Sequence, residues 1–160
     1  MNMKVLVAYY SLTGHTQRVA DEIAARCDAD VERIQDADVQ RAGWGGYFRS
    51  GWQAFAGIDS PIRPPLRRVA DYDLVVIGTP VWNWSLSSPM RSYAKAHARD
   101  IKRVAFFCTE GGSGDRRVFA ELEKLCGQQP VATVALRQQD VEQGRHITAV
   151  TTFVTRLGLP

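Results

Sequence analysis

The sequence has few cysteines and histidines, and neither type is arranged for a structural or catalytic centre. There are three of each, and the cysteines form no C-x-x-C pair. An odd number of unpaired cysteines excludes a disulfide framework, and histidines scattered along the chain do not have the spacing of metal ligands. We therefore predict neither disulfides nor a metal site. The residues are Cys27, Cys108, Cys126, His15, His97 and His146.

Long hydrophobic runs are absent as well. The first apolar run, over residues 5–10, is shorter than the apolar region of a secretory signal. Nowhere does the chain approach the roughly 20 apolar residues that a membrane span requires. These absences predict a cytoplasmic protein with no membrane span.

A strong charge of either sign is also missing. Lysine and arginine number 20 against 17 acidic residues, for a formal net charge of +3, which is too weak to predict a nucleic-acid partner. Hydrophobic residues make up 45% of the chain and charged residues 23%, as in ordinary globular proteins. Since a domain averages roughly 150 residues, we expect residues 1–160 to form a single domain.

Apolar runs and segments of helical periodicity alternate along the chain. Nearly continuous apolar runs are typical of strands that are covered on both faces, and apolar residues at helical spacing recur between them. The predicted strands are residues 4–9, 30–34, 74–78, 103–108 and 131–136. The predicted helices carry Val19, Ile23 and Cys27; Met90, Tyr93 and His97; Val118, Leu122 and Leu125; and Ile147, Val150, Val154 and Leu157.

This alternation predicts an α/β fold, a three-layer α/β/α sandwich around a five-stranded parallel sheet. Parallel strands need crossover connections, which are usually helical and right-handed. Five predicted strands are too few for a TIM barrel. The turn after the first strand also lacks the G-x-G-x-x-G pattern of a dinucleotide-binding fold.

A turn rich in hydroxyl side chains follows the first predicted strand and precedes a predicted helix. A helix N-terminus offers unpaired N–H groups and the positive end of the helix dipole, so such a turn is suited to a phosphate. The missing Walker lysine argues against nucleoside triphosphates. Alternatively, Ser11 or Thr13 only caps the helix. The candidate residues are Ser11, Leu12, Thr13, Gly14, His15 and Thr16.

A second candidate segment, expected to be a loop, follows the third predicted strand and contains two tryptophans. Ligands of open parallel sheets bind beyond the carboxyl ends of the strands, and tryptophans placed there are suited to covering a flat ring. The alternative is that both indoles fold back onto the domain. The residues are Thr79, Pro80, Val81, Trp82, Asn83 and Trp84.

A glycine-rich loop is expected after the fourth predicted strand. Its glycines permit close approach of the backbone to a ligand, or simply a turn with positive φ. Cys108 does not begin the C-x5-R motif of a tyrosine phosphatase, because position 114 is glycine. The candidate residues are Thr109, Glu110, Gly111, Gly112 and Ser113.

With these three segments the sequence resembles the flavodoxin family. The resemblance rests on residues 11–16, 77–82 and 108–113 and covers essentially the whole chain. It implies noncovalent flavin mononucleotide (FMN), with the phosphate on residues 11–16 and the ring between residues 79–84 and 109–113. It also implies the strand order 2-1-3-4-5 and, because the fifth strand is uninterrupted, the short-chain form of the fold.

The resemblance implies a redox protein that either exchanges electrons with a partner protein or uses NAD(P)H to reduce a small acceptor such as a quinone. A flavin supplies such chemistry itself, so no catalytic acid–base pair is required, and none is evident. The alternative is a module on the same fold that binds another phospholigand or acts as a phosphoacceptor receiver. A receiver requires acidic residues at the ends of the first and third strands, where this chain has Tyr9, Tyr10, Ser11, Gly78, Thr79 and Pro80.

The chain departs from electron-carrying flavodoxins in its charge. Those proteins are typically acidic, whereas residues 41–70 here carry five arginines against one acid, Asp59. This cluster either weakens the case for a simple carrier or is a solvated basic face. Residues 43–57 contain five aromatics at mostly helical spacing, which predicts a helix packed on the sheet, with a flavin wall, a subunit contact or a membrane-surface patch as alternatives.

Three details concern the expected flavin ring. Trp82 is expected to pack on it, with Trp84 as the second choice. Residues 79–84 contain no glycine, and Asn83 is the residue there that best tolerates positive φ. Glu110, on a glycine-rich loop, is expected to be solvated and screened.

Overall fold

The computed structural model describes residues 2–37 and 59–159. The aromatic segment 43–57, together with Arg41 and Arg49, lies outside these residues. The strands are β1 (Val5–Tyr9), β2 (Asp30–Arg33), β3 (Leu74–Trp82), β4 (Ser85–Leu86), β5 (Val104–Glu110) and β6 (Thr133–Arg137). The α-helices are α1 (His15–Cys27), α3 (Ser88–His97), α4 (Asp115–Cys126), α5 (Gln138–Glu142) and α6 (Ile147–Arg156), and η2 (Val69–Asp71) and η3 (Ala98–Asp100) are 3₁₀ turns.

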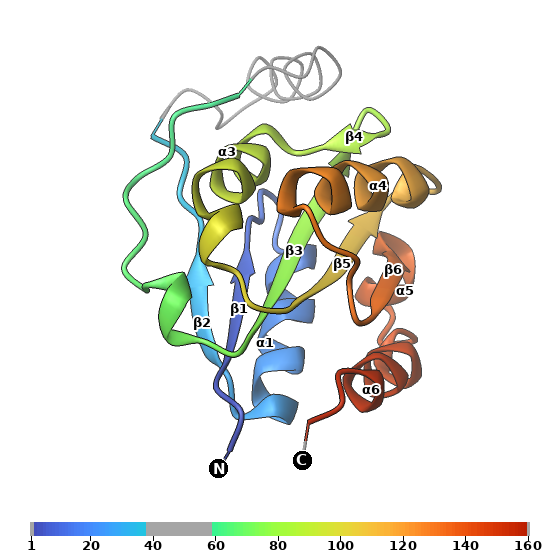
Figure 1. The fold of residues 1–160 in the computed structure, drawn as a ribbon. Helices are drawn as coiled ribbons and strands as arrows, with labels where there is room; N and C mark the ends of the chain where they lie inside the picture. The colour runs from blue at the N-terminus through green and yellow to red at the C-terminus, as the bar shows by residue number, and fades with distance from the viewer. Residues whose placement is uncertain (1, 38–58, 160) are drawn as a thin grey trace.

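The sheet has the predicted parallel arrangement with one small addition. Its strands lie in the order β2-β1-β3-β5-β6, and every neighbouring pair in this path is parallel. Counted as five parallel strands, this is the order 2-1-3-4-5. The addition is β4, a two-residue strand that pairs antiparallel with the end of β3 (Figure 1).

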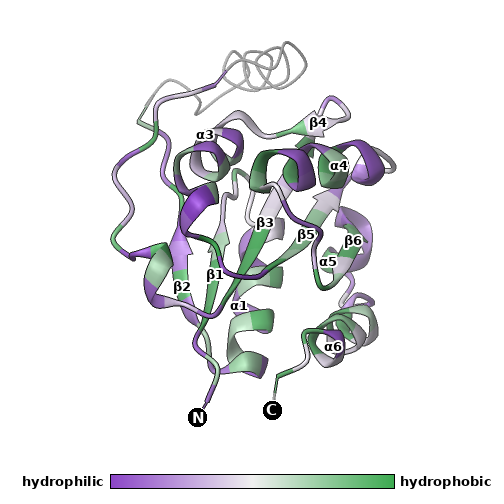
Figure 2. Cartoon of the chain, in the orientation of Figure 1, coloured by the Kyte–Doolittle hydropathy of each residue, from purple (hydrophilic) through white to green (hydrophobic). Residues whose placement is uncertain are grey.

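Each face of the sheet is covered by helices, which gives the predicted three layers. The helices α1 and α6 pack on one face and α3 and α4 on the other. Successive strand residues point to opposite faces, so Val75 and Ile77 belong to the core under α3 and α4, while Leu74 and Val76 belong to the core under α1 and α6. Figure 2 shows hydrophobic and hydrophilic residues side by side along α3 and α4, as expected of helices with one buried face.

The strands β3 and β5 are longer than the sequence predicts. The third strand continues through Trp82 and the fourth parallel strand through Glu110, so residues 79–82 and 109–110 are strand and not loop. Sheet pairing explains the extension, since Thr79 and Pro80 pair with Cys108 and Thr109. Pro80 lies beyond the last residue pair of β1 with β3, where a residue without an N–H group is tolerated.

A tight hairpin follows β3. Asn83 has φ 48° and Trp84 has φ 59°, and two consecutive residues with positive φ are typical of the type I′ turn that joins antiparallel strands. Asn83 therefore adopts the predicted positive φ, but so does Trp84. A bulky residue in this conformation is unusual, which indicates that contacts elsewhere hold the turn in place.

In residues 2–37 and 59–159 the longer helices follow the predicted apolar periodicity, whereas the pattern does not predict the short helix α5 or the 3₁₀ turns η2 and η3. Within the described ranges, no helix combines the length and the apolar character that a membrane span needs.

Candidate functional site

The carboxyl ends of β1 and β3 are the place where the chain connections diverge. The two strands pair as far as Tyr9 and Gly78. From β1 the chain passes through α1 to β2 on one side, and from β3 it passes to β5 on the other. In open α/β sheets this switch point, at the carboxyl ends of the strands, is the usual ligand site.

The hydroxyl-rich turn, residues 11–16, joins the carboxyl end of β1 to α1 at this switch point. Gly14 is the N-cap of α1 with φ 99°, a conformation that glycine adopts without strain. Its N–H group donates to Ser11 Oγ at 3.1 Å, and the helical hydrogen bonds begin with Arg18 N–H to Gly14 O at 3.0 Å. The N–H groups at the start of α1 have no partner within the helix. The N-cap is thus glycine and not Ser11 or Thr13, and the hydroxyls surround the positive end of the helix.

Two threonines join this turn to strand β5, which lies beyond β3 in the sheet. The Oγ1 atoms of Thr16 and Thr109 lie 2.8 Å apart and both side chains are buried. Two residues that are 93 positions apart in the sequence thus meet at the carboxyl edge of the sheet.

The hairpin and the glycine-rich loop are in contact. The indole N–H of Trp84 donates to Ser113 Oγ at 3.1 Å, and Trp84 is 60% exposed. A Cβ atom on Gly114 would lie 2.6 Å from Val81 Cγ1 and 3.1 Å from Trp84 Cα, so only glycine allows this approach. The sequence predicts the loop, but the role of Gly114 in seating the hairpin against it is visible only in the structure.

The two tryptophans are placed very differently. Trp82 is 7% exposed and packs edge-on against Tyr10, with ring centroids 5.3 Å apart. Trp84, the second choice for ring packing, is the accessible indole. Leu12 packs against the same core cluster as Trp82.

A buried arginine that the sequence does not reveal anchors the hairpin. Arg91, on α3, is 3% exposed. Its guanidinium donates to Leu86 O at 3.2 Å and to Glu121 Oε1 on α4 at 2.6 Å. Removing one partner from such a buried pair is strongly destabilising, so Arg91 ties β4 to both helices on this face.

A comparison with protein-family models matches residues 4–143 to flavodoxin. The chain belongs to the flavodoxin family. No curated protein matches it significantly.

Solved structures share the fold of this flavodoxin-family chain at low identity. A flavoprotein from Lactobacillus acidophilus, in complex with FMN, is 20% identical with a TM-score of 0.73, over 88% of this chain and 97% of that one. A two-electron reduced flavodoxin from Megasphaera elsdenii is 22% identical with a TM-score of 0.53, over 82% and 85%. An NADH:FMN oxidoreductase in its apo form is 14% identical with a TM-score of 0.59, over 98% and 90%.

Two of the predicted site residues in this flavodoxin are buried and engaged in hydrogen bonds with other parts of the protein. Thr79 Oγ1 lies 2.8 Å from Ser87 Oγ. Glu110 is only 7% exposed, and its Oε2 accepts from Asp115 N–H at 3.1 Å at the start of α4. The expectation that Glu110 is solvated is therefore wrong, because the strand extends two residues beyond the predicted end at residue 108 and includes Glu110.

Burial raises the pKa of Glu110 above its ordinary value of 4.5, and the charge of Asp115 raises it further. The hydrogen bond from Asp115 N–H and the charge of Arg137 lower the pKa in part. Because the folded protein then holds this proton more tightly than the unfolded chain, stability falls as the pH rises through the raised pKa.

We expect the variant Glu110→Gln to lose this pH dependence while keeping an oxygen that accepts from Asp115 N–H. The free energy of unfolding of the wild type relative to the variant should decrease from about pH 4.5 upward and then level off. Urea denaturation of both proteins across this range measures the difference. Two parallel pH profiles would contradict the assignment.

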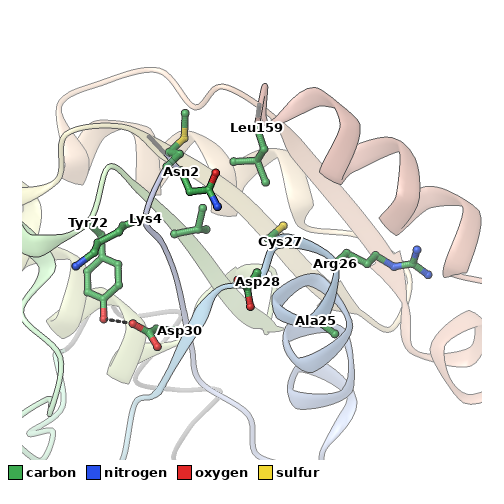
Figure 3. A pocket seen from close by; sticks show the side chains of 11 residues that line it. Asn2, Lys4, Ala25, Arg26, Cys27, Asp28, Asp30, Tyr72 and Leu159 are labelled. Atoms are coloured by element: carbon green, nitrogen blue, oxygen red, sulfur yellow. Dashed lines mark hydrogen bonds between the residues drawn. The ribbon is translucent and has the colours of Figure 1, made fainter.

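A hollow of about 660 Å³ lies at the opposite end of this flavodoxin, at the amino ends of the strands. Figure 3 shows Lys4, Arg26, Asp28 and Asp30 around it, with Tyr72 donating to Asp30 Oδ2 at 2.8 Å. It contains none of the predicted site residues. In the part of the chain that the structure describes, no cluster of three or more histidine, cysteine or acidic residues is arranged to hold a metal.

Proposed function

We propose that this flavodoxin binds FMN noncovalently, with its phosphate on residues 11–16 and its ring between residues 79–84 and 109–113. The observation that carries the proposal is the hydroxyl-rich turn, which leaves β1 at the switch point and encloses the N-terminus of α1. The family match and the FMN complex of the L. acidophilus flavoprotein support it.

The residues present fit such a ligand. A phosphate at residues 11–16 would meet N–H groups at the start of α1 together with the hydroxyls of Thr13 and Thr16, which are donors suited to an anion without a full opposing charge. Added Cβ atoms on Gly14, Gly111 and Gly112 would meet no atom within 4 Å, so the backbone is open to close approach at both segments.

We further propose a redox role, either electron exchange with a partner protein or NAD(P)H-linked reduction of a small acceptor such as a quinone. A bound flavin supplies the electron-accepting chemistry, and the protein binds, orients and shields it. The indole of Trp84 is exposed beside the glycine-rich loop, and in this proposal an electron donor or acceptor approaches the flavin ring there. The fold that this chain shares with an NADH:FMN oxidoreductase is compatible with either role.

The direct test is the absorbance of the purified protein in the flavin bands, followed by titration of the apoprotein with FMN and with riboflavin. We expect FMN to bind and riboflavin, which lacks the phosphate, to bind more weakly. Equal affinity for both ligands would show that residues 11–16 do not bind the phosphate. Turnover of NADH or NADPH with a quinone, measured on the FMN-loaded protein, then separates a reductase from a carrier.

The two tryptophans give different predictions. If Trp84 covers the flavin ring, Trp84→Ala should raise the fluorescence of bound FMN and weaken binding by about twofold to tenfold, as the loss of an aromatic pair of about 0.5–1.5 kcal/mol implies. Trp82→Ala should mainly lower stability, because Trp82 is a core residue. Quenching that is lost only in the Trp82 variant would assign the ring contact to Trp82.

A further inference from the structure

A chain of hydrogen bonds connects the hydroxyl-rich turn to α5, a helix that is far from it in the sequence. His15, the first residue of α1, has its Nδ1 atom 2.9 Å from Thr13 Oγ1 and its Nε2 atom 2.8 Å from Glu142 Oε1 at the end of α5. Glu142 lies 127 positions away in the sequence. The chain therefore runs from a hydroxyl through an imidazole to a carboxylate, inside the turn where the proposed function places the FMN phosphate.

The hydrogens in this chain can be counted. The carboxylate of Glu142 only accepts, so Nε2 of His15 donates to it. In the neutral ring Nδ1 is then an acceptor, and the hydroxyl of Thr13 must donate to it. A threonine hydroxyl has a single hydrogen. While His15 is neutral, Thr13 is therefore committed to the imidazole and has no hydrogen for a phosphate oxygen.

Protonation of His15 reverses the hydrogen bond between His15 and Thr13. Both ring nitrogens of the charged imidazole donate, so Nδ1 donates to Thr13 Oγ1 and the hydroxyl hydrogen becomes available. From this we infer that binding of the phosphomonoester is coupled to uptake of a proton by His15, which Glu142 holds in position. The inference rests on the proposed function and adds a cation to a phosphate site that is otherwise neutral.

The surrounding charges favour this coupling. Glu142 alone would repel a phosphate, whereas an imidazolium between two anions is attracted to both. The other charged groups nearby are engaged elsewhere: Arg18 of α1 pairs with Glu22, and Asp140 of α5 pairs with Arg145. His146, ahead of α6, also contacts Glu22, and β5 presents the uncharged hydroxyl of Thr109. Histidine changes its charge between about pH 5 and pH 8, where such coupling is measurable.

Calorimetric titration with FMN in buffers of different ionisation enthalpy measures the protons taken up for each FMN bound. The matched variant is His15→Gln, whose amide can donate to Glu142 but cannot gain a proton. The wild type should take up measurably more protons for each FMN bound than the variant. The second ionisation of the phosphate, near pH 6, is common to both proteins. With riboflavin the two proteins should not differ.

The affinity for FMN gives a second measure. Relative to His15→Gln, the wild type should gain about threefold to fivefold in affinity between about pH 8.5 and pH 6, the size of an ion pair at a partly exposed site. Equal proton uptake in both proteins overturns the inference. Should His15→Gln fail to fold, Glu142→Gln replaces it. This variant should take up fewer protons for each FMN bound than the wild type, and equal uptake overturns the inference. No FMN binding by the wild type at any pH would instead contradict the proposed function.

Discussion

Replacing Thr13 or Thr16 with alanine is expected to weaken FMN binding about tenfold to a hundredfold. Each change removes one hydroxyl donor to a phosphate, and a hydrogen bond to a charged group contributes about 1.5–3 kcal/mol. The Thr16 variant also loses a second contact, because the hydroxyl of Thr16 lies against that of Thr109 in a buried environment. Fluorescence titration of the apoproteins with FMN measures the change.

Matched variants separate a lost phosphate contact from a general defect. Thr16→Ser keeps the hydroxyl and should retain most of the affinity, while Thr155→Ala, at an exposed position on α6, should have no effect. Riboflavin affinity should change little in Thr13→Ala. If both alanine variants bind FMN like the wild type, residues 11–16 do not hold its phosphate.

Gly78→Ala is expected to cause a large loss of stability. A Cβ atom on Gly78 would overlap the ring of Phe107 on the adjacent strand β5. Overpacking a core usually costs about 1–3 kcal/mol and occasionally more, and here neither the strand nor the buried ring has room to move. Since a domain is stable by only about 5–15 kcal/mol, we expect the midpoint of urea unfolding to fall markedly.

Two further variants test this explanation. Gly111→Ala, where a Cβ atom meets nothing within 4 Å, should be nearly neutral in stability. In Gly78→Ala combined with Phe107→Leu, the smaller side chain should remove the overlap, so the double variant should lose less stability than the sum of the single variants. Additive losses would show that the ring is not the cause.

Local patterns in the sequence are enough to predict the layers of this protein, whereas the strand order 2-1-3-4-5 is what the resemblance to the flavodoxin family implies. Runs such as residues 74–78 are apolar at every position because both faces of the sheet are covered, and helical periodicity around Val118 and Leu122 marks a helix with one buried face. These are local patterns, so one sequence is enough to read them. The turn at residues 11–16 was also predictable, since its hydroxyls and glycine stand directly between a strand and a helix.

The ends of the strands and the side chains that face the site could not be predicted from local sequence patterns. Whether β3 stops at Gly78 or continues to Trp82 depends on partners for its backbone. Strand β5 pairs with it as far as Pro80, and β4 pairs with Val81 and Trp82. The extension of β3 explains the burial of Trp82 and the exposure of Trp84. The extension of β5 places Glu110 where it accepts from Asp115 N–H at the start of α4. The contact of His15 with Glu142 depends on packing between α1 and α5. No local pattern contains such contacts, because they join residues that meet only when the sheet and its helices are assembled.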